Sequence, residues 1–456
     1  MKPSATVALN ALSNHLIARG REIFKLGLGQ SPFPVPEPVV AALRRHAPCK
    51  DYLPVKGLPE LREAVADYHR RASGIDCRGE DVLIGPGSKE LMFLLQIVYY
   101  GDLIVPSPAW VSYAPQARIV GRPVHFIHTT REANWRLGPE QLDALCREDP
   151  DRPRIVILNY PSNPTGGTYE EGELRAIAEV ARRYRVVLLA DEIYGELHHR
   201  GRHLSVARFY KEGTILSSGL SKWCGAGGWR LGTFTFPRDL RWLLDAMGAV
   251  ASETYTSTSA PIQWAAVTAF TGGAEIHRYL IDARRVLQAL GNRICDDLEG
   301  EGIDPLRPEG GFYLFPDFRR WREPLRARGI ATSPFLCTRL LDETGVAILP
   351  GAEFGRPVEE LTARVAYVDF DGGAALAAAR ALPAEAGIDE TFLERHCGRM
   401  LDAIRRIGAW LEKGEEVKPT FAAERPAEPH RLDTSWRGIR EKWASMWARP
   451  GRRSAR

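Results

Sequence analysis

The stretch that decides the fold is Ser217-Ser218-Gly219-Leu220-Ser221-Lys222-Trp223-Cys224-Gly225-Ala226-Gly227-Gly228-Trp229-Arg230-Leu231-Gly232. It follows an apolar run at 214–216 that predicts a short buried strand. A lysine, a glycine-rich loop and an arginine eight residues after the lysine are typical of a site for a carbonyl-bearing, phosphate-carrying cofactor. Lys222 would form a Schiff base with the carbonyl, and Arg230 would bind the phosphate. A solvated surface lysine in a flexible loop explains this stretch, taken alone, equally well.

Composition indicates an ordinary globular chain, long enough at 456 residues for two domains. Hydrophobic residues make up 44% of the chain and charged residues 26%. The formal net charge of +4 is small, and much of the excess lies at the extreme C-terminus. The composition therefore predicts no nucleic-acid partner for the protein as a whole.

The seven cysteines are odd in number and scattered, and none forms a CxxC pair. We expect reduced thiols, with neither a disulfide framework nor a metal site. The N-terminus shows no basic segment followed by an apolar run, and no apolar stretch approaches the ~18 residues of a membrane span. These features predict a soluble, cytoplasmic protein.

Two glycine-containing turns follow predicted strands in the first hundred residues. Residues 24–29 predict a short strand that ends at Gly29, where a backbone amide would lie beside a ligand. Residues 81–84 predict a strand that runs through Gly85-Pro86-Gly87 into Ser88 and Lys89, where a helix begins. Free amides at such a helix N-terminus bind phosphate, although many turns of this kind bind nothing.

Three further polar or aromatic side chains follow predicted strands. Trp110 comes after the strand at 103–106, Asn163 after the strand at 154–160, and Asp191 closes the apolar strand at 186–191. Tyr194 lies three residues beyond Asp191, so both side chains would contact the same ring-sized ligand. Ligands of open α/β sheets bind at the carboxyl ends of the strands. Taken singly, Trp110 fits a core tryptophan and Asp191 fits a helix cap.

The alternation of strands and helices from about 80 to 235 predicts an α/β fold with a doubly wound, mostly parallel sheet. The pattern changes near 275 to a smaller α+β domain. We expect an N-terminal segment (1–45) that joins the small domain, a large domain (46–275), the small C-terminal domain (276–413) and a tail (414–456).

The tail begins with a linker rich in proline, glutamate and alanine and ends in four arginines. Residues 433–448 predict a helix with Trp436, Trp443 and Trp447 on one face. A tail that is disordered or docks on its own dimer is the favoured interpretation. A partner-binding or membrane-surface helix is the alternative, so its partner is not predicted.

Together these positions resemble the class I/II aminotransferases, pyridoxal-phosphate enzymes of fold type I, to about residue 410. The most specific motifs are Asn163-Pro164-Thr165-Gly166, Asp191-Glu192-Ile193-Tyr194, Ser221-Lys222 with Arg230, and residues 346–351. The resemblance implies transfer of an amino group between an L-amino acid and a 2-oxo acid by a ping-pong mechanism. It also implies a homodimer with shared active sites.

The resemblance further implies a role for each matching residue. Lys222 would attach the cofactor and shuttle a proton, and Asp191 would pair with the pyridine nitrogen. Asn163 and Tyr194 would bind the ring's phenolic oxygen, and Trp110 would stack on the ring. The phosphate contacts would come from Ser88, Lys89, Ser221, Arg230 and, from the second subunit, Tyr52. Arg364 would bind the substrate carboxylate, with Gly29, Asn163 and Trp110 nearby.

Some positions depart from the family pattern. Gly219 stands where many relatives have a serine, so either Ser218 or Ser221 would contact the phosphate. Ala366 replaces a common serine, and no basic residue is assigned to a distal substrate carboxylate. Elimination, decarboxylation or cyclisation on the same cofactor therefore remains the alternative reaction. A cofactor-sensing regulator is disfavoured, because only about 25 residues precede the first family-like strand.

Overall fold

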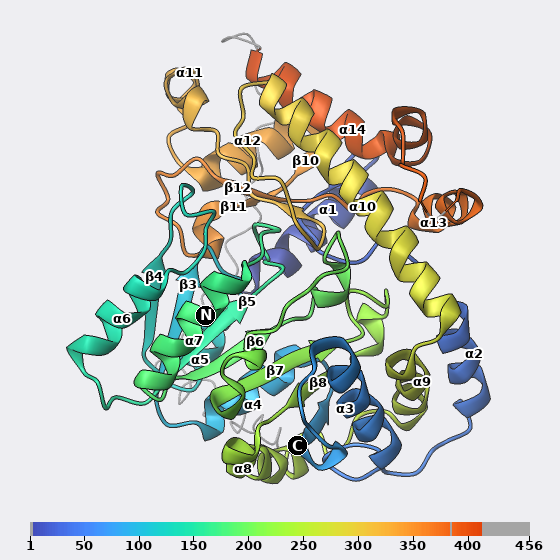
Figure 1. Cartoon of the computed structure of the whole chain (residues 1–456). Coiled ribbons are helices and arrows are strands. Elements are labelled where there is room, and N and C mark those ends of the chain that lie inside the picture. Colours follow the sequence, from blue (N-terminus) through green and yellow to red (C-terminus); the bar gives the residue numbers. More distant parts are fainter. Residues whose placement is uncertain (1–2, 384, 413–456) are drawn as a thin grey trace, which may run out of the picture. The chain divides into compact units, whose positions relative to one another are not determined.

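A seven-stranded sheet contains most of the predicted strands (Figure 1). In the computed structural model, which describes residues 3–383 and 385–412, the strand order is β2-β8-β7-β6-β5-β3-β4. The strands are β2 (Val82–Gly85), β3 (Asp102–Ser107), β4 (Val124–His128), β5 (Arg154–Asn159), β6 (Val187–Asp191), β7 (Thr214–Gly219) and β8 (Gly232–Thr235). Five of them, from β7 to β4, are parallel, whereas β8 is antiparallel to both β7 and β2. The mostly parallel sheet is confirmed.

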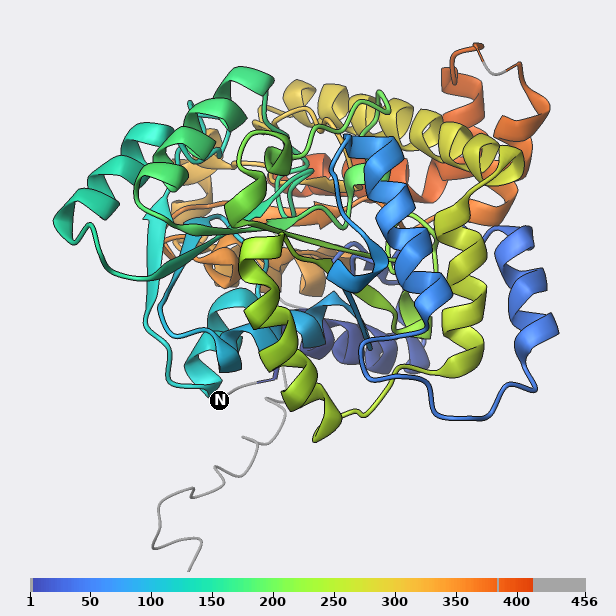
Figure 2. The same cartoon turned by 60° about the horizontal axis from the view of Figure 1, so that its bottom comes forward.

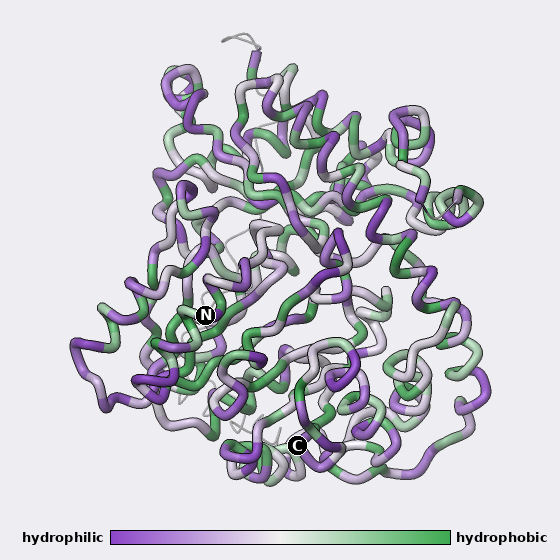
Figure 3. Tube along the Cα trace, viewed as in Figure 1, coloured by the Kyte–Doolittle hydropathy of each residue, from purple (hydrophilic) through white to green (hydrophobic). Residues whose placement is uncertain are grey.

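Helices cover both faces of this sheet, as a doubly wound fold requires. One face carries α4 (Ser88–Val98), α5 (Tyr113–Ile119) and α8 (Arg241–Ser252), and the other carries α6 (Pro139–Glu148) and α7 (Glu171–Arg183). Successive strand residues point to opposite faces of the sheet. Ile155 and Ile157 therefore pack in the core beneath α4, α5 and α8, whereas Val156 and Leu158 pack in the core beneath α6 and α7. Figure 3 shows hydrophobic and hydrophilic residues alternating along α6, at the left edge.

Three helices, α2 (Glu37–His46), α9 (Ala260–Thr271) and α3 (Pro59–Ser73), lie side by side (Figure 2). The long α10 (Ala274–Gly300) continues from α9 and packs against α13 (Gly372–Ala381) and α14 (Glu390–Glu412). Buried residues of all these helices belong to one hydrophobic core.

Two small sheets complete the described structure. The first pairs β1 (Phe24–Lys25) with β10 (Val346–Ala347), and the second has the order β11 (Leu349–Pro350), β12 (Ala363–Ala366), β9 (Tyr313–Leu314). The helices near these sheets are α1 (Ala5–Ala18), α11 (Arg322–Ala327) and α12 (Ser333–Thr344). The pairing of β1 with β10 agrees with an N-terminal segment that joins the small domain, although the domain boundaries themselves stay a prediction.

Several expected strands are shorter than predicted. The strand expected at 310–316 is reduced to β9, because Gly311 has a φ of +68° and Pro316 lacks a backbone donor. The strand expected at 24–29 ends at Lys25, and the strand expected at 346–349 is divided between β10 and β11. Conversely, the strand expected at 214–216 extends to Gly219. The sequence did not indicate α1, α5, α6, α8, α9 or α11.

Within residues 3–383 and 385–412, no helix is both long and apolar enough to cross a bilayer. The tail at 414–456, with the helix predicted at 433–448, lies outside the described residues.

Candidate active site

A cavity of about 450 Å³ lies where the carboxyl ends of the parallel strands meet the small sheets. All but one of the predicted site residues line it: Gly29, Ser88, Lys89, Trp110, Asn163, Asp191, Tyr194, Ser221, Lys222, Arg230 and Arg364. The exception is Tyr52, whose residue surface is 89% exposed and which does not line the cavity. One chain therefore brings together every predicted site residue except the one expected to serve a second subunit.

Lys222 lies just beyond the end of β7, in the glycine-rich loop. Its Nζ donates a hydrogen bond to the Gly29 carbonyl oxygen at 2.6 Å and lies 5.6 Å from the centroid of the Tyr194 ring. The amine is thus directed toward the segment after β1 and the phenol that follows β6. Ser221 beside it lines the cavity, whereas Ser218 is buried within β7 and does not. This placement favours Ser221 as the hydroxyl available to a ligand.

Asp191 is buried at the end of β6 and is held by three neighbours that the sequence reading did not assign. Tyr113 donates its hydroxyl hydrogen to Asp191 Oδ2 at 2.6 Å, and Ser217 donates to Oδ1 at 3.2 Å. Asn159 donates its amide to the Asp191 backbone oxygen at 2.8 Å. The strand register explains the last two contacts, since Asn159, Asp191 and Ser217 are paired across β5, β6 and β7.

The environment of Asp191 also changes its acidity. Burial raises the pKa of its carboxyl from 3.8 to about 6, although hydrogen bonds from Tyr113 and Ser217 and the charge of Lys222 act in the opposite direction. A buried carboxylate of this kind is stabilised by any cation brought against it. The carboxyl is therefore suited to hold a protonated ring nitrogen.

Three cationic side chains surround the N-terminus of α4. Burial, together with the charges of Arg230 and Lys222, lowers the pKa of Lys89. Arg230 approaches so closely that a Cβ on Gly87 would lie 2.2 Å from its Nη2 atom. Gly87 itself has a φ of +97°, which only glycine adopts readily. The first amides of a helix have no partner within it, so Ser88, Lys89 and Arg230 form a suitable anion site.

Arg364, on β12, is 1% exposed and defines a third corner of the cavity. Its Nη1 donates to Asn163 Oδ1 at 3.0 Å, and its Nη2 donates to the Gly27 carbonyl oxygen. Its buried Nε has no hydrogen-bond partner among the described residues. A buried guanidinium with unused donor capacity is suited to bind a carboxylate.

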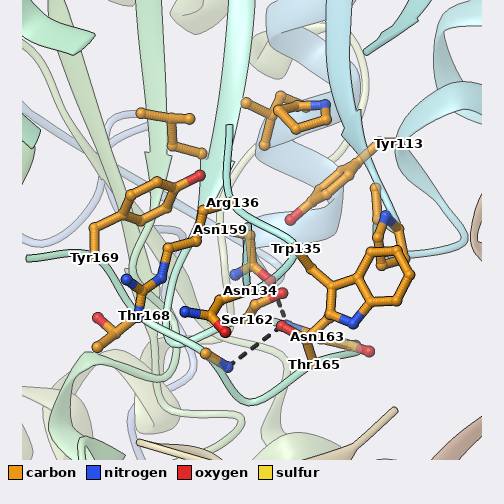
Figure 4. Close-up of a pocket in the computed structure, with 16 residues that line it drawn as sticks. Tyr113, Asn134, Trp135, Arg136, Asn159, Ser162, Asn163, Thr165, Thr168 and Tyr169 are labelled. Carbon is orange, nitrogen blue, oxygen red and sulfur yellow. Dashed lines mark hydrogen bonds between the residues drawn. The ribbon is translucent and has the colours of Figure 1, made fainter. Parts of the chain in front are cut away.

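A second, much smaller pocket of about 30 Å³ lies behind Asn163 (Figure 4). It shares Tyr113, Asn159 and Asn163 with the larger cavity and is otherwise lined by residues such as Trp135 and Thr165. The Asn163 backbone donates to Asn159 Oδ1 at 2.7 Å. The volume is near that of a single water molecule, so this pocket supports the position of Asn163 rather than holding a cofactor.

Sequence reasoning missed several other residues that line the cavity. Tyr313 on β9 and Ser4, Thr6 and Val7 at the start of α1 all reach it. The signal for Tyr313 was the run after Gly310-Gly311, which the sequence reading treated only as a strand. The N-terminal residues offered no comparable pattern.

Comparison with known proteins gives a consistent result. The sequence profile of the family described as "Aminotransferase class I and II" matches residues 21–369. The aspartate/prephenate aminotransferase of Thermus thermophilus is 34% identical over 359 residues, covering 78% of this chain and 89% of that protein. The asparagine–oxo-acid transaminase of Streptococcus mutans is 32% identical, covering 78% and 91%.

Solved structures agree. The aspartate aminotransferase from Thermus thermophilus with maleate superposes with a TM-score of 0.77 at 30% identity, covering 90% of this chain and 97% of that chain. The aspartate aminotransferase from Rhizobium meliloti gives a TM-score of 0.78 at 26% identity, with 91% and 98% covered.

Proposed function

The chain belongs to the class I and II aminotransferases and transfers amino groups between amino acids and 2-oxo acids; we propose that it uses pyridoxal phosphate bound at Lys222 and prefers an acidic substrate. The observation that carries the proposal is the meeting of Lys222, Asp191 and Arg364 in one cavity. An amine, a buried acid and a buried guanidinium are the groups that this exchange requires.

The residues fit pyridoxal phosphate at both ends of the molecule. The raised pKa of Asp191 and its hydrogen bonds to Tyr113 and Ser217 suit a partner for a protonated pyridine nitrogen. The helix end, with the backbone amides of Ser88 and Lys89, the Arg230 guanidinium and the Ser221 hydroxyl, suits a phosphate. Asn163 and Tyr194 would bind the phenolic oxygen, and Trp110 would pack against the ring.

Pyridoxal phosphate, when bound, withdraws electrons from the α-carbon of an amino acid and makes its hydrogen acidic. The protein residues have separate roles in the transfer. Lys222 Nζ would take the proton from the substrate α-carbon as a general base and, as a general acid, would deliver it to the carbon that was the cofactor's carbonyl carbon. Arg364 fixes the α-carboxylate with a two-point contact, and Asn163, hydrogen-bonded to Arg364, keeps its own amide available to donate.

The preference for an acidic substrate rests on Lys89. Lys89 lines the cavity, and its Nζ lies 5.0 Å from the centroid of the Trp110 ring, which also lines the cavity. The sequence reading used only the backbone of Lys89 and assigned no cation to a distal carboxylate. Relatives named for aspartate and prephenate act on substrates with such a second carboxylate.

A homodimer with shared sites is part of the same proposal. A tyrosine as exposed as Tyr52 is unusual for a residue that the family places against a phosphate. Its exposure in a single chain agrees with a function in the active site of a second copy. The mass of the protein in solution tests this point directly.

The deciding experiment titrates the cofactor-loaded protein with single amino acids and follows its visible absorption. Aspartate should bleach the visible band to a stable form, and a 2-oxo acid should restore it. Recovery without an oxo acid, with release of ammonia or carbon dioxide, would instead indicate elimination or decarboxylation.

Lys89→Gln tests the acidic preference within the same assay. Because aspartate and asparagine differ only in the distal charge, the variant should lose about 10- to 100-fold in kcat/KM with aspartate and little with asparagine. An equal loss with both would contradict the assignment of Lys89 and leave the amino-group transfer intact.

A further inference from the structure

Tyr313 lines the cavity, and neither the sequence pattern nor the proposed function gives it a role. The residue belongs to β9, is 1% exposed and lines the same cavity as Lys222. Its hydroxyl oxygen lies 2.8 Å from the hydroxyl oxygen of Tyr194. Among the described residues, this is the only hydrogen bond of either hydroxyl group.

The position of the Tyr313 hydroxyl is fixed by three contacts, two of them with β12 and one with Gly29. Strand pairing places Tyr313 opposite Ala366 of β12. Gly29 leaves room for the phenol, because a Cβ at that position would lie 1.8 Å from the Tyr313 oxygen. Arg364 covers the ring, with its Cζ 4.9 Å from the ring centroid. The hydroxyl therefore has little freedom to turn away from Tyr194.

Each phenol has one hydrogen, so only one of the two can donate in the hydrogen bond between them. If Tyr194 donated to Tyr313, its hydrogen would point away from a ligand in the cavity. If Tyr313 donates, the Tyr194 hydrogen is free to point inward. The Arg364 cation lies 4.9 Å from the Tyr313 ring centroid, nearer than Lys222 Nζ lies to the Tyr194 centroid at 5.6 Å, and this closer charge makes the Tyr313 hydroxyl the better donor.

We propose that Tyr313 is a positioning residue that donates its phenolic hydrogen to Tyr194 and thereby directs the Tyr194 hydroxyl hydrogen into the cavity. The inference rests on the proposed function, in which that hydrogen meets the phenolic oxygen of the cofactor. Donation to the Tyr194 oxygen polarises its O–H bond, so the pair stabilises a phenolate better than Tyr194 alone. Tyr313 acts on the bound cofactor only through Tyr194.

The test is a pH titration of the visible absorption of the cofactor-loaded protein. Tyr313→Phe should raise the midpoint of this absorption change by about 0.5 to 1 pH unit, the shift expected from one hydrogen bond. The reason is that the deprotonated form of the bound cofactor loses stabilisation. In a Tyr194→Phe background, the same substitution should change the midpoint by less than about 0.2 unit. Thermal unfolding of each variant checks that the fold is retained.

Tyr367→Phe is the matched control. Tyr367 is also buried and donates its hydroxyl hydrogen, to the Gly311 carbonyl oxygen at 3.2 Å, but it does not line the cavity. Its substitution should leave the midpoint unchanged. If the wild type titrates but Tyr313→Phe has the same midpoint as the wild type, this inference alone is overturned. The same holds if Tyr313→Phe shifts the midpoint equally in the wild-type and Tyr194→Phe backgrounds. A wild-type protein that acquires no visible band would overturn the proposed function as well.

Discussion

Replacing Asp191 with asparagine should make the cofactor-free protein more stable at neutral pH. Burial raises the pKa of this carboxyl from 3.8 to about 6, so the folded state holds the proton more tightly than the unfolded state does. The stability linked to this proton is fully present below pH 3.8 and is lost as the pH rises to about 6. A difference of about 2 units corresponds to ~3 kcal/mol at pH 7. Asparagine, which does not ionise, avoids this loss.

Urea unfolding of the cofactor-free wild type and Asp191→Asn between pH 4 and pH 8 measures the effect. The difference in the free energy of unfolding should widen in favour of the variant from pH 4 to about 6 and then level off. Asp102→Asn is a control of opposite sign. Burial alone would raise the Asp102 pKa, but hydrogen bonds from Arg152 and His125 outweigh it and lower the pKa.

For Asp102, the wild type should gain stability over its asparagine variant only as the pH rises to about 4, so the difference for this pair should stay nearly constant between pH 4 and pH 8. A pH-independent difference for Asp191→Asn, or one that narrows from pH 4 to 6, would refute the reasoning about its burial. With the cofactor added, the same variant should bind it about 10- to 100-fold more weakly, since a charge-assisted contact is lost. The substitution thus separates stability from function.

Three further outcomes are expected. Lys222→Ala should retain the fold by circular dichroism but release the cofactor on dialysis and lose turnover; normal activity would contradict the assignment of the lysine. Arg364→Lys should lower kcat/KM for amino acids by about 10- to 100-fold, because a single ammonium replaces a two-point contact, and steady-state kinetics measure this. Mixing inactive Tyr52→Ala and Lys222→Ala subunits should restore about a quarter of the wild-type activity if each site uses both chains, whereas independent sites would give none.

The sequence was most informative where strand ends carry polar residues. Asp191, Asn163 and Lys222 follow apolar runs, and the carboxyl ends of parallel strands lie at one edge of a sheet, so their convergence was predictable. Arg364 became a site residue only through the family resemblance. Its strand, β12, is four residues long and carries no periodic signal.

Residues that act through tertiary contacts were not predictable from local pattern. Tyr113 lies on a helix and reaches Asp191 across 78 positions of sequence, and Ser217 does so only through strand register. Tyr313 meets Tyr194 because a small sheet packs against the carboxyl end of the large one. Side-chain partners of this kind depend on how sheets pack, which one sequence does not specify.

The distribution of charge in the cavity would determine how the proposed cofactor is oriented. Asp191, at the end of β6, offers a negative group, whereas Arg230 and the free amides at the N-terminus of α4 offer a positive end. A molecule with a protonated ring nitrogen at one end and a phosphate at the other is favoured in one orientation and opposed in the reverse. In that orientation Asn163 and Tyr194 would hold the ring's phenolic oxygen, and Lys222 would be the residue that binds the carbonyl carbon. Arg364, on a separate sheet, would then bind the substrate α-carboxylate. The three charged groups would therefore fix the positions of both the cofactor and the substrate.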